Sequence, residues 1–302
     1  MQTLESSILI SGGAGFIGSH VTERLVDSDT EIVIIDNFDP FLYERKIKEK
    51  NIENITTKPN VKLYTMDLRN SEQIETLFKE HKFSQVLHLA ARAGVRPSLR
   101  YPLAYEEFNV RATLNLLELC RKYNVEHFVF GSSSSVYGAN TKIPFSETDN
   151  TDNPISPYGA SKKACEVYCS TYSHLYSIPI TCLRFFTVYG PRQRPEMAIH
   201  LFTRLIDENK PITIFGDGTA KRDYTYISDI VDGTIAALET QLKFEIINLG
   251  DSNPIELNSN RLVSGQIGLL FFVHILVKLG ESDAANLADS LSCQAQFLAD
   301  FF

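Results

Sequence analysis

Tyr158 and Lys162 stand four residues apart in a stretch, Pro157–Tyr176, whose pattern predicts a long helix. The i, i+4 spacing puts both side chains on one helix face. A free phenol loses its proton near pH ~10, and making it a base at neutral pH requires roughly 4 kcal/mol, at about 1.36 kcal/mol per pH unit. An ammonium group ~4 Å away in a partly buried site can supply about that much. The pair therefore predicts proton abstraction by a tyrosine, although a Tyr/Lys pair standing alone would be read as an ordinary surface pair.

A serine cluster follows the expected strand His127–Gly131, in the run Gly131-Ser132-Ser133-Ser134-Ser135-Val136-Tyr137-Gly138. A hydroxyl at the end of this strand can share the reacting O–H of a substrate with Tyr158. A serine-rich run is usually only a loop. We therefore give this cluster a catalytic role only because Tyr158 and Lys162 follow it.

A glycine-rich turn lies between an expected strand, Ser7–Ser11, and an expected helix, Phe16–Val26. Glycines there allow a tight turn and the close approach of a pyrophosphate, and the helix N-terminus supplies unpaired N–H groups. Asp36 ends the next strand, Glu31–Asp36, where a carboxylate accepts from the adenosine ribose and repels a 2′-phosphate. The alternative is a purely structural turn. The pattern favours NAD over NADP, with contacts from Gly12, Gly15, Phe16, Ile17, Gly18, Asp36 and Asn37.

Two further strand ends face the same edge of the predicted sheet, after Val61–Thr65 and within Gln85–Leu89. Doubly wound sheets bind ligands at the carboxyl ends of their strands. We expect Asp67 to accept from the adenine amino group and the small alanines to let the cofactor lie against the backbone. Loop capping and plain packing are the alternatives for this set, which comprises Asp67, Leu68, Leu89, Ala90 and Ala91.

Short apolar runs alternate with longer helical patterns along the chain, which predicts an α/β fold. We expect a Rossmann-like doubly wound parallel sheet with a smaller C-terminal substrate-binding part. The boundaries are an NAD-binding domain at 1–187, a substrate part at 188–257 and an atypical tail at 258–302, with more than one crossing between the first two. The remaining expected elements are strands at Pro179–Arg184 and Ile212–Phe215 and helices at Ser71–Glu80, Leu103–Tyr123, Ala198–Glu208 and Asp229–Thr240.

The composition disfavours a nucleic-acid partner, a membrane span and a disulfide-bonded fold. A net charge of −8 disfavours a nucleic-acid partner. The most apolar run, Ile267–Val277, is far short of the ~20 residues that a membrane-spanning helix needs. Five cysteines without paired spacing, and no signal peptide, favour a reducing cytoplasm. Cys165 and Cys169 share a helix face but lack further ligands nearby, so we expect no metal site.

The order of these features resembles the NAD-dependent epimerase/dehydratase family of the extended short-chain dehydrogenase/reductase superfamily. The motif Gly94-Val95-Arg96 and the run from Arg184 to Pro195 resemble the UDP-glucuronate 4-epimerase group more than the UDP-galactose group. The resemblance covers about residues 6–257. Further matching stretches are Ala93–Arg96, Asn109-Val110, Leu183–Pro191, Phe215–Gly218 and Arg222–Tyr226.

The resemblance implies an enzyme that converts UDP-glucuronate to UDP-galacturonate. The phenolate of Tyr158 would take the proton of the sugar 4-hydroxyl while the C4 hydride moves to bound NAD. The resulting 4-keto sugar would turn and take the hydride back on its other face. By motif position, Ser133 is the hydroxyl partner, and Lys162 binds the nicotinamide ribose.

The resemblance also implies the residues that bind the nucleotide sugar. Guanidinium forks suit phosphate and carboxylate oxygens. Arg96 and Arg100 form a weaker cluster with Arg92, but Pro97 is expected to break any helix there. Family relatives dimerise through two helices, which implies a homodimer through Leu103–Tyr123 and Pro157–Tyr176. The predicted substrate contacts are Ser134, Ser135, Arg92, Thr187, Arg192, Arg194 and Arg222.

Three functions other than UDP-glucuronate epimerisation were considered. The sister 4,6-dehydratases carry an Asp-Glu pair where this chain has Ser134 and Ser135, so dehydration is disfavoured. Epimerisation of UDP-glucose or UDP-N-acetylglucosamine remains possible, because the serines and Thr187 suit a C6 carboxylate without requiring one. A catalytically impaired NAD- or nucleotide-sugar-binding protein is the third, because the sequence leaves the family pattern beyond about Leu257.

Overall fold

A computed structural model describes residues 7–213 and 221–256 of the chain, in two compact units. The first unit holds the described residues up to Phe186 together with Ile227–Gly250. The second holds the described residues of Thr187–Tyr226 and those from Asp251 on. The chain therefore crosses between the units more than once, as expected. The functions given to residues 1–187 and 188–257 stay predictions, and the tail at 258–302 lies outside the described residues.

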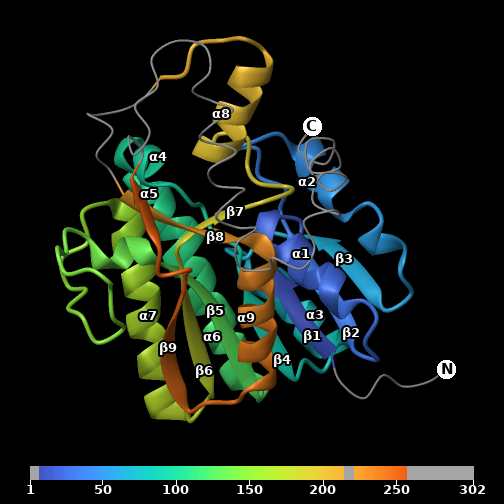
Figure 1. The fold of residues 1–302 in the computed structure, drawn as a ribbon. Coiled ribbons are helices and arrows are strands. Elements are labelled where there is room, and N and C mark those ends of the chain that lie inside the picture. Colours follow the sequence, from blue (N-terminus) through green and yellow to red (C-terminus); the bar gives the residue numbers. More distant parts are fainter. Residues whose placement is uncertain (1–6, 214–220, 257–302) are drawn as a thin grey trace, which may run out of the picture. The chain divides into compact units, whose positions relative to one another are not determined.

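A seven-stranded parallel sheet forms the first unit, in the order β3-β2-β1-β4-β5-β6-β9 (Figure 1). Several strands are apolar runs that are buried along their length, as parallel strands covered on both faces must be. Strand order reverses at β1, which lies between β2 and β4, and such a point opens a ligand crevice at the carboxyl edge. The predicted fold class is thereby confirmed. The strands are β1 (Ser7–Ser11), β2 (Glu31–Asp36), β3 (Val61–Thr65), β4 (Gln85–His88), β5 (His127–Ser133), β6 (Ile180–Phe185) and β9 (Phe244–Leu249).

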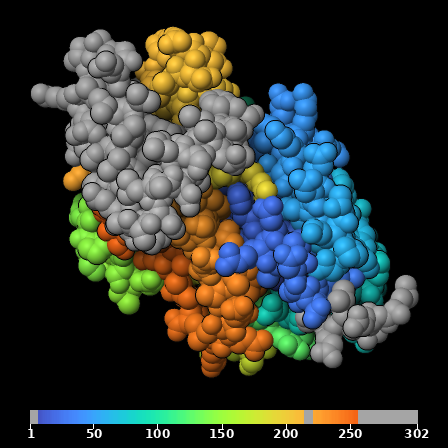
Figure 2. Space-filling model, turned by 45° about the vertical axis from the view of Figure 1, so that its right-hand side comes forward, coloured from blue at the N-terminus to red at the C-terminus, as the bar shows by residue number. Residues whose placement is uncertain are grey.

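Helices cover both faces of this sheet. On one face, α1 (Phe16–Leu25) packs beside α9 (Ile227–Glu239), as Figure 2 shows in blue and orange. On the other, α3 (Ser71–Glu80), α6 (Ala112–Lys122) and α7 (Pro157–Tyr176) enclose the main hydrophobic core. The shorter helices are α2 (Arg45–Ile52), η1 (Ile55–Thr57), α4 (Val95–Arg100), α5 (Pro102–Tyr105), η2 (Glu106–Arg111) and η3 (Ser134–Tyr137).

Two helical expectations are corrected by the structure. Pro97 does not prevent a helix, because it occupies the first turn of α4, where the missing N–H has no intrahelical acceptor to lose. The expected helix Leu103–Tyr123 is instead α5, then the π-helix η2, then α6. Buried Asn109 lies in the π-helical part, a local geometry that is frequent at functional sites.

The second unit has a small three-stranded sheet in the order β10-β8-β7. β7 (Thr187–Tyr189) and β8 (Lys221–Tyr226) pair in parallel, and β10 (Pro254–Glu256) pairs antiparallel with β8. Helix α8 spans Ala198–Asp207. Ile212 and Thr213 are not in a strand, in contrast to the expected strand Ile212–Phe215, whose last two residues lie outside the described residues.

Within residues 7–213 and 221–256, no helix is long and apolar enough to cross a membrane, and no group of three or more ligating side chains could hold a metal ion. Cys120, Cys165, Cys169 and Cys182 are free thiols buried in the core. Burial raises the pKa of the Cys165 thiol to about 11, so this side chain is an inert core group.

Candidate active site

The tyrosine and lysine lie in the first turns of α7. Ser156 caps this helix, its Oγ accepting from the Gly159 N–H at 3.0 Å, and Pro157 follows at the first helical position. Lys162 is 4% exposed, and its Nζ donates to the Gly131 carbonyl of β5 at 2.6 Å. Tyr158 is half-buried, with its ring edge-on to Tyr105. The lysine is thereby held at a fixed place against the end of β5.

The serines lie where β5 passes into η3. Ser133 is the last residue of the strand, and its Oγ accepts from the Ser135 N–H at 3.2 Å, which turns the chain into η3. Because a hydroxyl can accept and donate at once, this leaves its O–H able to donate to a substrate oxygen. A Cβ on Gly159 would lie 2.6 Å from the Ser135 carbonyl oxygen, so only glycine lets α7 approach this closely. The structure thus brings the serine turn and the first turn of α7 together.

The glycine loop forms a backbone cradle after β1. Gly12 has φ +73°, and a Cβ there would lie 2.7 Å from the Ala90 nitrogen. A Cβ on Gly18 would lie 2.3 Å from the Gly12 carbonyl oxygen. Gly15 precedes α1 and supplies no side-chain cap, so the first N–H groups of this helix are left to bind an anion. These features fit the pyrophosphate of a dinucleotide.

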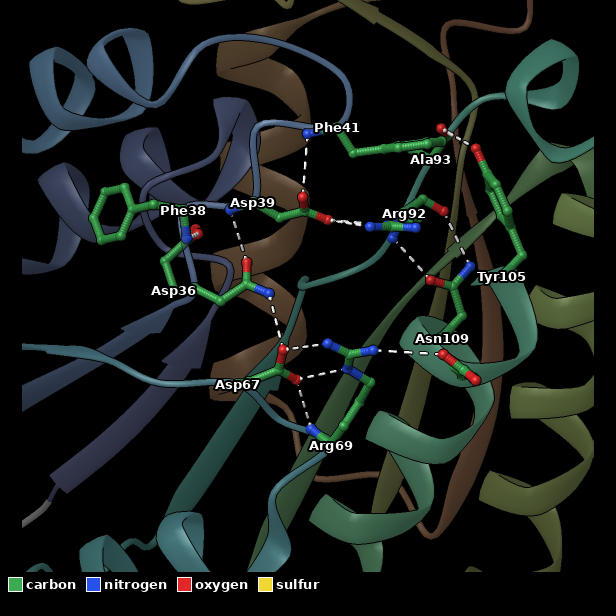
Figure 3. A network of polar contacts seen from close by, with 12 residues as sticks. Asp36, Phe38, Asp39, Phe41, Asp67, Arg69, Arg92, Ala93, Tyr105 and Asn109 are labelled. Carbon is green, nitrogen blue, oxygen red and sulfur yellow. Dashed lines mark hydrogen bonds and ion pairs between the residues drawn. The ribbon is translucent and has the colours of Figure 1, made fainter. Parts of the chain in front are cut away.

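Acidic side chains end β2 and follow β3, as expected for the adenosine half of the cofactor. Asp36 is 7% exposed, accepts from the Phe38 N–H at 2.8 Å and lies 3.7 Å from Lys48 Nζ. Asp67 pairs with Arg69 at 2.8 Å and accepts from Asn37 Nδ2 at 3.4 Å (Figure 3). Hydrogen bonds from Arg69 hold the pKa of the Asp67 carboxyl below its ordinary value. The Asp67 carboxyl is therefore an ionised acceptor at neutral pH.

Arg92, predicted to contact the sugar, is paired within the protein. Its Nη2 lies 2.7 Å from Asp39 Oδ2 (Figure 3). Its guanidinium also stacks on the rings of Phe41 and Phe108. Asp39 follows β2 and Arg92 follows β4, and these strands flank β1. The ion pair therefore ties together two loops on either side of the glycine loop. A direct role in substrate binding would require Arg92 to exchange this partner, and it stays a prediction.

Replacing Arg92 with Met should loosen the cofactor site. Loss of the ion pair frees the two loops, so we expect NAD to dissociate about tenfold faster, equivalent to about 1.4 kcal/mol. Displacement of bound NAD by a fluorescent analogue would measure this rate. Arg121→Met, which removes a surface pair with Glu118 on α6, is the matched control. Equal dissociation rates in wild type and Arg92→Met would contradict the prediction.

A buried polar chain links the ends of β1 and β4 to η2 and α6. Thr113 Oγ1 donates to the Asn109 carbonyl, so it accepts from His88 Nε2 at 3.0 Å. His88 Nδ1 in turn accepts from Ser11 Oγ at 2.6 Å, and Ser11 Oγ accepts from the Ala90 N–H. Burial, with a smaller contribution from the charge of Lys162, lowers the pKa of His88 to about 3. The imidazole is therefore neutral in the folded protein.

This neutral histidine should make stability depend on pH. The unfolded chain protonates His88 near 6.5, whereas the folded protein does so only near 3. Between these values the unfolded state binds the extra proton, so the free energy of unfolding falls as pH falls, by about 2 kcal/mol between pH 7 and pH 5. Urea unfolding of wild type and His88→Asn at both pH values would measure it. An identical pH dependence in the two proteins would contradict this assignment.

The remaining predicted substrate contacts lie in the second unit. Thr187 begins β7 opposite Tyr224 of β8. Arg222 is exposed on β8, and its Nη1 donates to the Lys221 carbonyl. Arg192 follows β7 with φ +63°. The structure therefore places the predicted substrate residues Thr187, Arg192, Arg194 and Arg222 in one unit, and Ser134, Ser135 and Arg92 in the other.

Arg194 has a local indication of an anion ligand. Its Nε lies 3.3 Å from Glu196, while its Nη1 is buried and has no hydrogen-bond partner among the described residues. Gln193 holds this turn in place, with Nε2 donating to the Val188 carbonyl and Oε1 accepting from the His200 N–H. A buried N–H without an acceptor is costly, and a phosphate or carboxylate oxygen would relieve that cost.

Several residues that support the site were not predicted from the sequence. Asn109 links two elements, accepting from the Arg92 N–H and donating to Ser161 Oγ at 2.9 Å on α7. The sequence marked it only as part of the family-matching stretch Asn109-Val110 and predicted no role for it. Asp39 and His88 carry no motif. The partners of all three are distant along the chain, so only the fold reveals them.

Parallel-sheet topology, the glycine cradle and the Tyr158–Lys162 helix together define a dinucleotide-dependent α/β enzyme acting on a hydroxyl group. The model of the NAD dependent epimerase/dehydratase family matches residues 8–250, and the chain belongs to this family. Membership confirms the predicted resemblance and the dependence on NAD. Residues 258–302 lie outside both this match and the described residues.

Relatives of known activity are similar over most of the chain. A UDP-glucuronate 4-epimerase from Thermodesulfobacterium geofontis is 46% identical over 83% of this chain and 77% of its own length. The crystal structure of UDP-glucuronic acid 4-epimerase from Bacillus cereus, in complex with UDP-glucuronic acid and NAD, has a TM-score of 0.78 at 39% identity, covering 83% of this chain and 80% of that one. A UDP-N-acetylglucosamine 4-epimerase from Methanobrevibacter ruminantium has a TM-score of 0.76 at 33% identity, covering 84% and 79%.

Proposed function

We propose that this chain interconverts UDP-glucuronate and UDP-galacturonate by epimerisation at the sugar C4. The proposal rests on one observation. Lys162 Nζ donates to the Gly131 carbonyl and so attaches α7 to the end of β5, beside the serine turn. In this arrangement we infer that Tyr158 and Ser133 would present their hydroxyls to one substrate hydroxyl. The 46% identity to a UDP-glucuronate 4-epimerase supports the choice of sugar.

The chain's own residues would handle the proton, the orientation and the charge of the substrate. The nicotinamide of bound NAD supplies the hydride acceptor and donor at C4. Tyr158 Oη would take the proton of the 4-hydroxyl and return it after the sugar has presented its other face, while Ser133 Oγ donates to the same oxygen. Gly12, Gly15 and Gly18 would bind the dinucleotide pyrophosphate, and Asp36 its adenosine ribose. The residues proposed to complete the cofactor site are Phe16, Ile17, Asn37, Asp67, Leu68, Leu89, Ala90, Ala91 and Lys162.

The nucleotide sugar would be held by cations and hydroxyls. We assign the diphosphate to Arg194, because its buried Nη1 lacks an acceptor among the described residues, with Arg192 and Arg222 as further cations. Ser134, Ser135 and Thr187 would contact the C6 carboxylate. UDP-N-acetylglucosamine is the second candidate sugar, because the fold is nearly as similar to an epimerase of that class, with a TM-score of 0.76 against 0.78.

NMR of the sugar anomeric signals tests the proposal directly. Purified protein is incubated with UDP-glucuronate and no added NAD, with UDP-glucose and UDP-N-acetylglucosamine in parallel. Appearance of UDP-galacturonate establishes the substrate, the reaction and a retained cofactor together. Turnover of another sugar alone would replace the proposed substrate. No turnover of any sugar, even after NAD is added, would leave the chain an NAD- or nucleotide-sugar-binding protein of this family.

A homodimer in the cytoplasm completes the proposal. Along α7, Val167 and Leu175 are 52% and 61% exposed, and Leu103 of α5 is 79% exposed. Exposed apolar side chains gathered on the expected dimer helices favour a second copy as their partner. The buried free thiols suit a reducing compartment. Light scattering at increasing protein concentration would measure the dimer, and a constant monomer mass would contradict it.

A further inference from the structure

An ion pair between α7 and β6 lies buried beside the proposed catalytic residues. Glu166 and Arg184 have side chains that are each 1% exposed. Arg184 binds the Glu166 carboxylate through two parallel hydrogen bonds, with Nε 2.9 Å from Oε1 and Nη2 2.8 Å from Oε2. Such bidentate pairs fix geometry as well as charge.

Other polar groups complete this pair. Ser132 Oγ donates to Glu166 Oε1 at 2.6 Å. The third guanidinium nitrogen of Arg184, Nη1, donates to Tyr137 Oη at 2.9 Å, and Tyr137 Oη donates to Asn248 of β9 at 2.7 Å. The network therefore joins β5, η3, β6, α7 and β9 of the first unit. Each strong donor or acceptor in it has a partner.

Three residues of α7 contact β5 or the serine turn at a regular spacing along the helix. Gly159 contacts the backbone of Ser135, Lys162 donates to Gly131, and Glu166 accepts from Ser132. These three positions lie on one face of the helix, about one turn apart. Glu166 is the last of them and the only one that also binds the neighbouring strand β6.

Stability alone is a weak explanation for such a pair. Removing two charges from water is expensive, and apolar side chains of similar size often serve as well or better. A buried pair does, however, favour one register of the elements that it joins, because any slip leaves a charge without its partner. The elements joined here carry Tyr158, Lys162 and Ser133.

We propose that Glu166 and Arg184 are positioning residues that hold α7 in register with β5, and so keep Tyr158 and Lys162 aligned with Ser133. The inference rests on the proposed epimerase function, which the pair serves without touching the substrate. A shift of about 1 Å in such an alignment can cost on the order of 10²-fold in rate. The ion pair would thus affect the rate of turnover by keeping Tyr158, Lys162 and Ser133 in place.

A double variant separates positioning from stability. Glu166→Met with Arg184→Met removes both charges and keeps similar volume, so we expect a cooperative melt near that of wild type. We expect kcat to fall on the order of 10²-fold, with KM changed less than about threefold. Arg24→Met with Asp232→Met, which removes an exposed pair joining α1 and α9, is the matched control.

A double variant that melts like wild type and keeps its kcat would overturn the proposal. If the double variant does not fold, Arg184→Lys gives the same comparison, because it keeps the charge and loses the fork. We expect that variant to lose about tenfold in kcat, and an unchanged kcat would again overturn the proposal.

Hydrogen exchange makes the test independent of turnover. Amides of residues 157–166 should exchange faster in Glu166→Gln than in wild type or the control, with no substrate present. Unchanged exchange would overturn the positioning role. A wild type that epimerises no sugar would instead defeat the proposed function, and the exchange result would still report on the register of α7.

Discussion

Replacing Tyr158 with Phe is expected to lower the rate of UDP-glucuronate epimerisation by about 10²–10⁴-fold, the usual contribution of a positioned acid–base group. The change removes one oxygen and keeps the ring that packs edge-on to Tyr105. Lys162 keeps its bond to the Gly131 carbonyl. Cofactor content and melting temperature should therefore stay at wild-type levels. NMR of the anomeric signals gives the rate, and denaturation with absorbance of the released NAD gives the content.

Tyr168→Phe is the matched control for this change. Tyr168 lies on the same helix and is 39% exposed, so the loss of its hydroxyl should not affect the rate. A Tyr158→Phe protein that retained more than about a tenth of wild-type activity would exclude Tyr158 as the acid–base group. A loss of bound NAD in parallel with activity would point to cofactor binding as its main role.

Replacing Gly12 with Ala should abolish NAD binding at ordinary cofactor concentrations. The new Cβ would lie 2.7 Å from the nitrogen and 2.8 Å from the Cα of Ala90, both backbone atoms that no side-chain movement can relieve. The residue also has φ +73°, which costs a non-glycine residue about 1–3 kcal/mol. Relief requires the loops after β1 and β4 to separate, and we propose that these loops bind the dinucleotide. Calorimetric titration with NAD and thermal melting would measure the two effects.

Gly15→Ala provides a graded comparison within the same loop. A Cβ there meets only the Gly12 carbonyl oxygen, at 3.1 Å, and the residue has φ −74°, which alanine adopts readily. We expect it to melt close to wild type and to weaken NAD less than Gly12→Ala does. If both substitutions weakened NAD equally and left the melting temperature unchanged, crowding against Ala90 would not be the reason.

The elements of the first unit were largely predictable because their signals are local. β1 and β2 begin and end where the apolar runs predicted them, since a strand buried on both faces needs an uninterrupted apolar sequence. The bounds of β3 were also predicted, although this edge strand is largely exposed. The prediction was wrong at α4, where a helix-breaking residue was judged without regard to its place in the first turn. It also missed the π-helical part around Asn109, because no periodicity distinguishes it from α-helix.

The main motifs of the proposed site, and their order along the chain, were evident from the residues alone. The glycine loop, Asp36 and the Tyr158–Lys162 pair could each be recognised because their partners are neighbours in the chain, where spacing alone fixes geometry. Which charged side chains are already paired within the protein became evident only from the fold. Arg92 was expected to bind substrate, yet it is paired with Asp39, 53 residues away. Arg184 lay in a recognised motif, and only the fold shows that Glu166 of α7 is its partner. Such pairings depend on which strands become neighbours in the sheet, and that is settled by the packing of the whole domain.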